Sequence, residues 1–520
     1  MTNSFLLLMC FFFLSLFKAT LSPYSTSPDF WLLKVWPSPM SVFNIASLES
    51  ILQRDHAAAG LDPLIRLVGL PERVPIAELG SDEGTDISPW MMDVACSMEN
   101  DFVQLVHELR AVAEGVGSEE SLGAPISVVY DAFLWWTLDV VVSLKLNYYT
   151  FFPSAASVLS ILLHMPLLIS QGYVPLRLSA EPRLITLPGL APTWDRELLY
   201  FLRDSEPKAI VQRIIDSALK LTETQTILVN TCYELEPYAI DALQKYENVH
   251  IKKSDVRALG PVLPLELLND NYVVDILYQQ GDNRKQEEKE CLKWLDSQSP
   301  ASVLFVCFGS IFTPSFENII ELALGLEASS HAFIWVLRSP PGVTSRDKGF
   351  SISMLLPEGF ESRTKDRSFI ISPPAPQLSI LSHPSTGGFL THCGWNSTLE
   401  SVSMGVPLIA YPQFADQKMN CRIIVDQWKV GIQLQNDENE RLRKEDVEKV
   451  VRNLMEGEEG KRMKGKVRQL RDITRRCCRE GGSSYTNLQV LVQELFKLSA
   501  SFTHEADNRV NMEISFLAAE

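Results

Sequence analysis

One stretch, from Pro374 to Gln417, constrains the fold more than any other part of this 520-residue chain. An apolar run at 388–392 predicts a buried strand, and another is predicted at 407–411. Between them a helix is predicted to open at Asn396-Ser397, both good N-cap residues, and to stop at Gly405. A helix that begins just beyond the carboxyl end of a parallel strand points its free N–H groups at that edge of the sheet. We expect a diphosphate to bind there.

Polar side chains gather around this predicted anion site. His392 can donate to a phosphate oxygen, and Asn396 and Ser397 add neutral donors. Glu400 lies one helical turn further on, where its carboxylate can accept hydrogen bonds from both hydroxyls of a ribose. These four residue types in this order suit the nucleotide part of a nucleotide sugar.

Three more residues suit the sugar part. Asp416 and Gln417, after the second strand, are a carboxylate and an amide that can bind the hydroxyls of a hexose. Trp395 can present its indole N–H or its ring face to the sugar. The alternative interpretation is a buried crossover with a histidine that is satisfied inside the core, but seven residues of this kind together favour a binding site.

These residues, together with the runs CLKWLDSQ and LVNTCYELEP, resemble the plant secondary-product signature of family 1 UDP-glycosyltransferases, in the hydroquinone glucosyltransferase branch. The likeness covers about residues 125–500. It implies an α/β fold of the GT-B type, with two Rossmann-like domains that face each other across a cleft. It also implies that UDP binds to the signature's histidine, asparagine, serine and glutamate, and that the closing acid and glutamine hold glucose.

The resemblance implies inverting transfer of glucose from UDP-glucose to a hydroxyl, which we expect to be phenolic, but two departures bear on it. The family's signature begins with a tryptophan that stacks on uracil, where this chain has Pro374. Loss of that stacking, about 1–3 kcal/mol, weakens UDP binding roughly five- to a hundredfold. Uracil binding then depends on backbone groups near Ala375 and Gln377. The second departure is Phe43, which falls where the family has its catalytic histidine.

Two further site residues are predicted at strand ends. Asp131 follows a buried run at 126–130, and by resemblance it is the aspartate that pairs with the catalytic histidine. With that histidine missing, Asp131 is the remaining catalytic candidate; the alternative is a helix N-cap for Ala132–Leu144. Ser310 ends the strand predicted at 301–308 and can offer its hydroxyl and N–H to a phosphate, as the family's serine does.

The alternation of predicted strands and helices indicates two domains with parallel sheets, and 520 residues are too many for one ordinary core. The predicted parts are an apolar N-terminal extension (1–30), an N-terminal acceptor-binding Rossmann-like domain (31–262), a linker (263–290), a C-terminal UDP-sugar-binding Rossmann-like domain (291–484), a C-terminal helix that packs back on the N-terminal domain (485–500) and a loose tail (501–520).

Composition and the absence of certain motifs exclude several classes of function. The formal net charge of -17 argues against a nucleic-acid partner, because no basic stripe could release counterions. The basic clusters at 441–449 and 461–476 alternate with acids, which is typical of solvated helix faces. Nine cysteines lack C-x-x-C spacing, and adjacent Cys477-Cys478 is poor zinc geometry, so we expect reduced thiols and no structural metal. Without a D-x-D motif we expect transfer without a metal or cofactor, with UDP-glucose as donor substrate.

The amino terminus bears on location. Phe5–Phe17 is apolar but too short to span a bilayer, and no positive residue precedes it as in a signal peptide. The run Asn396-Ser397-Thr398 is an N-glycosylation sequon inside the predicted site, where a glycan would block binding. We therefore expect a cytoplasmic monomer without a stable membrane span that binds a UDP-sugar and a small aglycone. The alternative is a secretory route with residues 5–17 as signal peptide.

Two alternatives to an active enzyme stay open. The chain can be an inactive homologue that binds nucleotide sugars, because Phe43 and Pro374 replace the family's base and its uracil platform. It is also possible that about the first fifty residues are not those of the working protein. The sequence does not choose among them.

Overall fold

The computed structural model describes most of the chain beyond residue 127 and shorter segments before it. The described ranges are 5–8, 30–34, 65–69, 99–113, 127–176, 181–203, 208–245, 255–263, 286–309, 313–338, 351–373, 375–437 and 441–494. Three positions singled out above, Phe43, Ser310 and Pro374, lie outside these residues.

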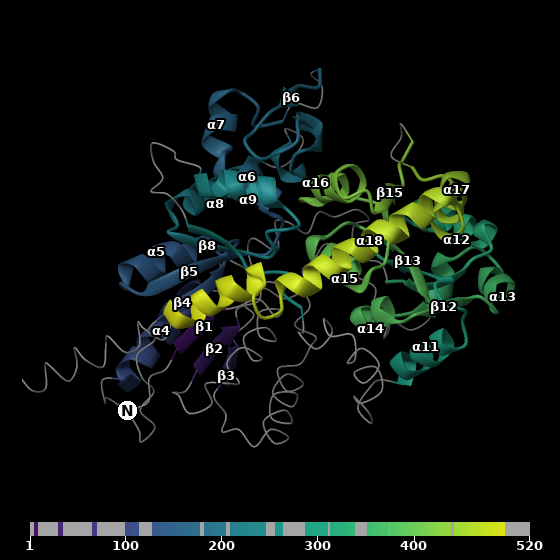
Figure 1. The fold of residues 1–520 in the computed structure, drawn as a ribbon, viewed down its shortest axis with the longest axis horizontal. Coiled ribbons are helices and arrows are strands. Elements are labelled where there is room, and N and C mark those ends of the chain that lie inside the picture. The colour runs from purple at the N-terminus through teal and green to yellow at the C-terminus, as the bar shows by residue number, and fades with distance from the viewer. Residues whose placement is uncertain are drawn as a thin grey trace, which may run out of the picture.

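A six-stranded parallel sheet forms the C-terminal half of the molecule (Figure 1). Its strands lie in the order β12-β11-β10-β13-β14-β15, so the chain starts in the middle, runs to one edge and returns to build the other. The strands are β10 (Val303–Cys307), β11 (Ala332–Val336), β12 (Ser368–Ile371), β13 (Thr386–Thr391), β14 (Leu408–Ala410) and β15 (Gly431–Gln433). The order reverses between β10 and β13, and ligands of such sheets bind at the carboxyl ends of the strands beside this reversal.

Helices cover both faces of this sheet because successive residues of its strands face opposite sides. On β10, Phe305 packs into one hydrophobic cluster and Leu304 into the other. The first cluster involves α11 (Gln286–Asp296), α14 (Gln377–Ser382), α15 (Trp395–Met404) and α18 (Glu458–Cys477), and the second α12 (Phe316–Ser329), α13 (Phe360–Thr364) and α17 (Lys444–Met455). The central strands β10, β13 and β14 are therefore buried on both sides, whereas the edge strands β12 and β15 are partly exposed.

The N-terminal half contains two sets of parallel strands. One has the order β4-β5-β8-β9 and the other β1-β2-β3, and β1 lies beside β4 (Figure 1). The strands are β1 (Phe5–Leu8), β2 (Phe30–Lys34), β3 (Ile65–Gly69), β4 (Ser127–Asp131), β5 (Asn147–Phe152), β8 (Thr226–Val229) and β9 (Asp255–Ala258). Part of the apolar stretch predicted as an extension thus forms a strand, which pairs with β2 over Phe5–Leu8.

The helices of this half are α4 (Glu99–Ala113), α5 (Trp136–Ser143), α6 (Ala156–Leu163), α7 (Met165–Ser170), α8 (Lys208–Glu223) and α9 (Pro237–Lys245), and β6 (Leu184–Ile185) pairs with β7 (Thr193–Trp194). In the part of the chain that the structure describes, no helix combines the length and the apolar character needed to cross a membrane. Helix α6, whose eight residues are all buried, is a core helix.

The two halves share one hydrophobic cluster. It contains Leu159 and Ile227 of the N-terminal half and Trp395, Leu399 and Met419 of the C-terminal half. Helix α18 runs along the C-terminal half toward the N-terminal half, and the helical residues 483–494 continue over the N-terminal half (Figure 1).

Polar contacts fix this last helix to the N-terminal half. Nδ2 of Asn487 donates to the carbonyl of Ala258 over 2.9 Å, and Arg257 pairs with Glu494 over 2.8 Å. Helix α11, which packs on the C-terminal sheet, begins at Gln286, inside the predicted linker. Acidic residues in its first turn favour the helix N-terminus, although few apolar residues mark it in the sequence.

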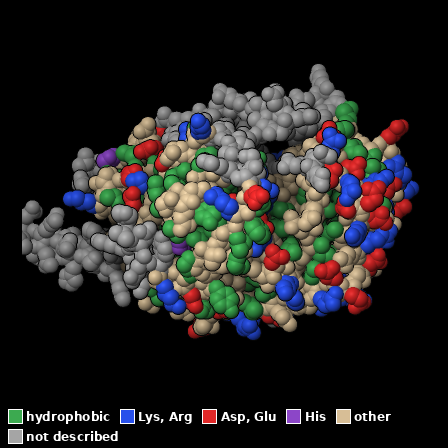
Figure 2. Space-filling model, turned by 90° about the horizontal axis from the view of Figure 1, so that it is seen from above, with side chains coloured by type: hydrophobic (Ala, Val, Ile, Leu, Met, Phe, Trp, Pro, Cys, Tyr) green, Lys and Arg blue, Asp and Glu red, His purple; other side chains and the backbone are tan. Residues whose placement is uncertain are grey.

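The charged helices carry their charges on the surface, as expected. On α17, Arg452 pairs with Glu448 over 2.9 Å, and on α18, Lys461 pairs with Glu458 over 2.6 Å. Figure 2 shows acidic and basic side chains interspersed over the visible face. That face has no basic stripe of the kind that binds nucleic acid.

Candidate active site

Helix α15 begins at the carboxyl edge of the C-terminal sheet, directly after β13. Cys393 has a left-handed backbone (φ 66°) and Gly394 is the N-cap, so the chain turns sharply into the helix. The prediction that Asn396 and Ser397 cap the helix is therefore wrong, because both lie in its first turn. First-turn N–H groups have no carbonyl partner within a helix, so the predicted anion-binding end remains. The predicted stop is confirmed at Gly405, which is left-handed (φ 78°).

Glu400, Ser397 and Gln377 form a hydrogen-bonded group beside this helix end. Nε2 of Gln377 donates to Oε2 of Glu400 over 2.5 Å and to Oγ of Ser397 over 3.0 Å. Glu400 is only 5% exposed, and burial raises the pKa of its carboxyl group from 4.5 to about 7. The group therefore holds a carboxyl that changes its charge near neutral pH.

The imidazole of His392 lies between two glycines. A Cβ at Gly309 would come within 2.7 Å of its Cε1 and Nε2, and a Cβ at Gly394 would overlap Nε2. The Nδ1 atom lies 3.4 Å from Oγ1 of Thr391. Burial lowers the pKa of His392 to about 4, so the ring is neutral at pH 7 and can donate one hydrogen bond without adding charge.

A buried asparagine of the N-terminal half, Asn230, contacts the start of α15. Its Nδ2 donates to Oδ1 of Asn396 over 3.0 Å, and its Oδ1 accepts from the N–H of Val262 over 2.9 Å. Its carbonyl accepts from the indole Nε1 of Trp395 over 2.6 Å, and that tryptophan is 4% exposed. The structure thus differs from the expectation for Trp395: its indole N–H binds the other half and its ring lies in the shared core.

Asp416 and Gln417 lie at the start of α16 (Gln417–Arg422), where the two halves meet. Oγ of Ser154, from the N-terminal half, donates to Oδ2 of Asp416, and burial raises the pKa of this aspartate. Oε1 of Gln417 accepts from the N–H groups of Gln413 and Phe414 over 2.9 and 3.1 Å. The carboxylate therefore bridges the halves, and the amide oxygen closes the loop before α16.

Asp131 is the last residue of β4, at the carboxyl edge of its sheet. Its Oδ1 accepts from the N–H of Phe133 over 2.9 Å. The alternative of an N-cap for a helix over Ala132–Leu144 is wrong, because α5 begins only at Trp136. Asp131 instead holds a turn at the strand end.

Next to α14, the carbonyl of Ala375 accepts from the N–H of Gln377 over 2.9 Å. Ala375 thus lies two residues before Gln377, whose side chain binds Glu400. Ser310 and Phe43 lie outside the described residues, so their predicted places are not defined.

Sequence reasoning missed two polar residues that contact the site. Ser154 follows β5 by two residues and Asn230 follows β8 directly. A signal for both was present, because each is a polar residue at the carboxyl end of a parallel strand, as His392 is. The pairing of each with its partner in the other half had no signal in the sequence.

The family model for UDP-glucoronosyl and UDP-glucosyl transferases matches residues 84–473 of this chain. The chain belongs to this family. UDP-glycosyltransferase 72B1 of Arabidopsis thaliana is 40% identical to it over 372 residues, which cover 71% of this chain and 74% of the relative. Hydroquinone glucosyltransferase of Rauvolfia serpentina is 38% identical over 364 residues, which cover 69% and 73%.

Solved structures resemble this UDP-glycosyltransferase over almost its whole length. A structure of Phytolacca americana UGT2 complexed with UDP-2fluoro-glucose and pterostilbene has a TM-score of 0.73 and 28% identity, and it covers 95% of this chain and 99% of the other. A UDP-glucosyltransferase from Polygonum tinctorium has a TM-score of 0.74, 29% identity and the same coverage. The expected GT-B fold, with two Rossmann-like domains facing each other across a cleft, is confirmed for this UDP-glycosyltransferase.

Proposed function

We propose that this UDP-glycosyltransferase transfers glucose from UDP-glucose to a phenolic hydroxyl of a small plant metabolite, with inversion at the anomeric carbon. The proposal rests chiefly on the group of Gln377, Ser397 and Glu400 at the N-terminus of α15, beside the neutral ring of His392. The relatives support the acceptor class, because one is a hydroquinone glucosyltransferase and one neighbour was solved with UDP-2fluoro-glucose and pterostilbene.

In this proposal the phosphates and the ribose bind at the end of α15. The ribose hydroxyls donate to the carboxylate of Glu400. His392, Asn396 and Ser397 donate to the diphosphate, whose charge the helix end stabilises. Ser310 adds a donor from the region after β10. In the free protein Nε2 of Gln377 donates to Glu400, so a ribose hydroxyl that binds Glu400 takes the place of this amide donor.

Uracil lies in this proposal against the segment before α14. With Pro374 in place of an aromatic residue, recognition falls to backbone groups of Ala375 and Gln377. The carbonyl of Ala375 already accepts from the N–H of Gln377 and keeps one lone pair for a donor of uracil, and neither residue supplies a ring to stack on.

The sugar lies in this proposal beside Asp416 and Gln417. The amide oxygen of Gln417 already accepts two backbone hydrogen bonds, so a glucose hydroxyl would accept from its Nε2. Asp416 would bind another hydroxyl from a position that Ser154 helps to fix. Trp395 does not contact the sugar in this proposal; its hydrogen bond to Asn230 holds the first turn of α15 in place.

The proposed step forms one C–O bond and breaks another. The phenolic oxygen of the acceptor attacks C1 of glucose on the face opposite UDP, and the bond from C1 to the β-phosphate oxygen breaks with its electron pair leaving on UDP. The acceptor's proton goes to Asp131, or to water when the phenol is already ionised. The donors at α15 stabilise the leaving diphosphate, so the step uses neither a metal nor a cofactor.

This mechanism predicts a preference among acceptors. A general base contributes about 10²–10⁴ in rate, and Phe43 replaces the family's base. A phenol with a pKa near 10 is ionised to roughly one part in a thousand at neutral pH, so it depends least on that base. Turnover of a simple phenol should far exceed that of the matching benzyl alcohol, and equal turnover would contradict the mechanism.

A second candidate is a protein that binds nucleotide sugars without turning them over, which Phe43 and Pro374 favour. Calorimetry with UDP-glucose, combined with a product assay on a phenol, separates the two: binding with product supports the enzyme, and binding without product supports the rival. The double variant F43H/P374W should then gain activity strongly if these departures are losses.

We also propose a cytoplasmic monomer. The Asn396 side chain of the sequon accepts a hydrogen bond from buried Asn230, so a glycan on it would break the contact between the halves. The acceptor then binds the N-terminal domain (31–262) and the UDP-sugar the C-terminal domain (291–484). Gel filtration of the purified chain tests the oligomeric part, and a dimer mass would contradict it.

A further inference from the structure

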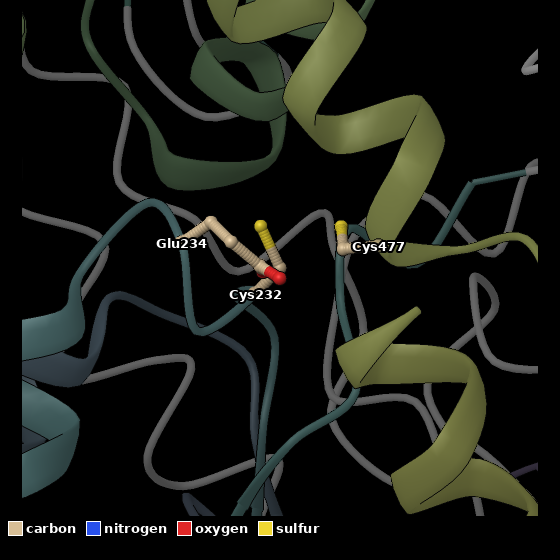
Figure 3. A group of neighbouring side chains, drawn as sticks. All are labelled: Cys232, Glu234 and Cys477. Atoms are coloured by element: carbon tan, nitrogen blue, oxygen red, sulfur yellow. The ribbon is translucent and has the colours of Figure 1, made fainter. Parts of the chain in front are cut away.

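Two cysteines and a glutamate from distant parts of the chain meet at the junction of the two halves (Figure 3). Cys232 and Glu234 follow β8 in the N-terminal half, and Cys477 is the last residue of α18. The thiols of Cys232 and Cys477 are 0% and 2% exposed, whereas Glu234 is exposed. None of these residues belongs to the candidate active site.

Their donor atoms are close enough to share a cation. The two sulfur atoms and a carboxylate oxygen of Glu234 all lie within 4.8 Å of one another. Zinc binds sulfur at about 2.3 Å and carboxylate oxygen at about 2.0–2.2 Å, so a tetrahedral site needs ligand atoms about 3.5–3.8 Å apart. Any two ligand atoms would need to approach by at most about 1.3 Å, which small rotations of the side chains can supply.

We propose that Cys232, Glu234 and Cys477 bind a divalent zinc-class cation that joins the two halves of the protein. Thiolate sulfur and carboxylate oxygen are both zinc ligands, and with three protein ligands the fourth tetrahedral position is open to water. Cys478, whose sulfur lies 4.0 Å from that of Cys477, is a further thiol beside the site.

The surroundings of the site meet two further requirements of a metal site, ligand orientation and access. Oγ of Ser483 donates to Oε2 of Glu234 over 2.7 Å, which fixes the carboxylate. The Sγ of Cys477 donates to the carbonyl of Thr474 over 3.1 Å, a bond that is given up when the thiol loses its proton to bind the cation. Exposed Glu234 provides a path by which the cation can enter from solvent.

The expectation of no structural metal rested on the spacing of cysteines along the chain, which cannot reveal ligands from distant segments. Cys232 and Cys477 are separated by almost half of the sequence, so no motif marks them. If the cation binds, it ties the segment after β8 to the end of α18 and stabilises the folded chain by mass action.

The test uses the full chain, reduced with a phosphine and freed of metal with a chelator. Titration with cobalt(II) chloride should produce a thiolate-to-cobalt charge-transfer band and the visible bands of tetrahedral cobalt, and zinc(II) chloride should then remove both. Saturation is expected at one cobalt per chain. Zinc should also raise the melting temperature.

Variants locate the site. C232S and C477S should each lose the charge-transfer band or weaken it strongly. E234Q should keep thiolate ligation but bind cobalt about tenfold or more weakly, and because Glu234 is exposed this variant is expected to fold. The matched control is C291S, which removes a buried thiol from α11 and should leave the titration unchanged.

Three results would overturn the proposal. The first is a wild-type chain that shows no thiolate-to-cobalt band. The second is a double variant C232S/C477S that keeps the band. The third is a free-thiol count and peptide mass that show Cys232 and Cys477 joined as a disulfide in the protein as purified.

Discussion

The buried carboxyl of Glu400 makes the proposed donor binding depend on pH. Its pKa is raised from 4.5 to about 7 by burial, so the group is protonated in part of the molecules at neutral pH. Only the carboxylate can accept from both ribose hydroxyls without presenting a proton of its own. We therefore predict that affinity for UDP-glucose rises as the pH rises through 7, and that E400Q removes this dependence.

The size of the effect follows from the ionised fraction. With a pKa near 7, about one-tenth of Glu400 is ionised at pH 6 and about nine-tenths at pH 8, so affinity should increase about tenfold between them. In E400Q the amide oxygen replaces a charged acceptor, which costs about 1.5–3 kcal/mol and lowers affinity about 10- to 100-fold at pH 8.

The stability of the free protein should change in the opposite sense. A raised carboxyl pKa means that the folded state binds the proton more tightly than the unfolded state does. This stabilisation is fully present below about pH 4.5 and is lost as the pH rises through 7, by ~3 kcal/mol in all. E400Q should therefore flatten part of the pH dependence of the urea midpoint.

Isothermal titration calorimetry from pH 6 to 8 measures the binding part. UDP-glucose is the ligand of choice, because its phosphates are diesters and lack the second ionisation near pH 6 that free UDP has. His392 does not interfere, since its pKa of about 4 keeps it neutral throughout. A flat wild-type profile, or the same slope in E400Q, would refute the reasoning.

Three more predictions concern single positions. N230A leaves the N–H of buried Val262 unpaired and breaks the bond to α15, so urea denaturation should show about 2–4 kcal/mol less stability. G394A places a Cβ against the ring of His392, and calorimetry should show about 10- to 100-fold weaker binding of UDP-glucose with unchanged circular dichroism. P374W should restore base stacking and tighten UDP binding roughly five- to a hundredfold.

Matched controls come from the same chain. N453A removes an asparagine whose amide binds Glu459 at the surface, and it should change stability by less than about 0.5 kcal/mol. G465A adds a Cβ in open space on α18 and should leave binding unchanged. If N230A is as stable as N453A, or G394A binds as G465A does, the contact concerned is not important. Equal UDP affinity of P374W and wild type would show that position 374 does not face uracil.

Local pattern was enough to predict the elements around the site. The apolar runs before and after α15 predicted β13 and β14, and Gly405 predicted the helix end, because each depends on residues close together in the chain. The start of α15 was predicted too late. Gly394 is the N-cap through its backbone conformation alone, whereas the sequence favoured Asn396 and Ser397 because their side chains can cap a helix. The polar first turns of α11 carried too few apolar residues to reveal a helix.

The sequence by itself determined the two-domain parallel α/β fold, the family and the set of polar residues at the strand ends. These features depend on short-range periodicity and on one contiguous motif. Only the tertiary structure decided which residues meet across the junction. It joined Asn230 to Asn396, Ser154 to Asp416 and Cys232 to Cys477, and it turned the indole of Trp395 into the shared core. Such contacts depend on how two separately patterned halves pack, and no local pattern encodes that packing.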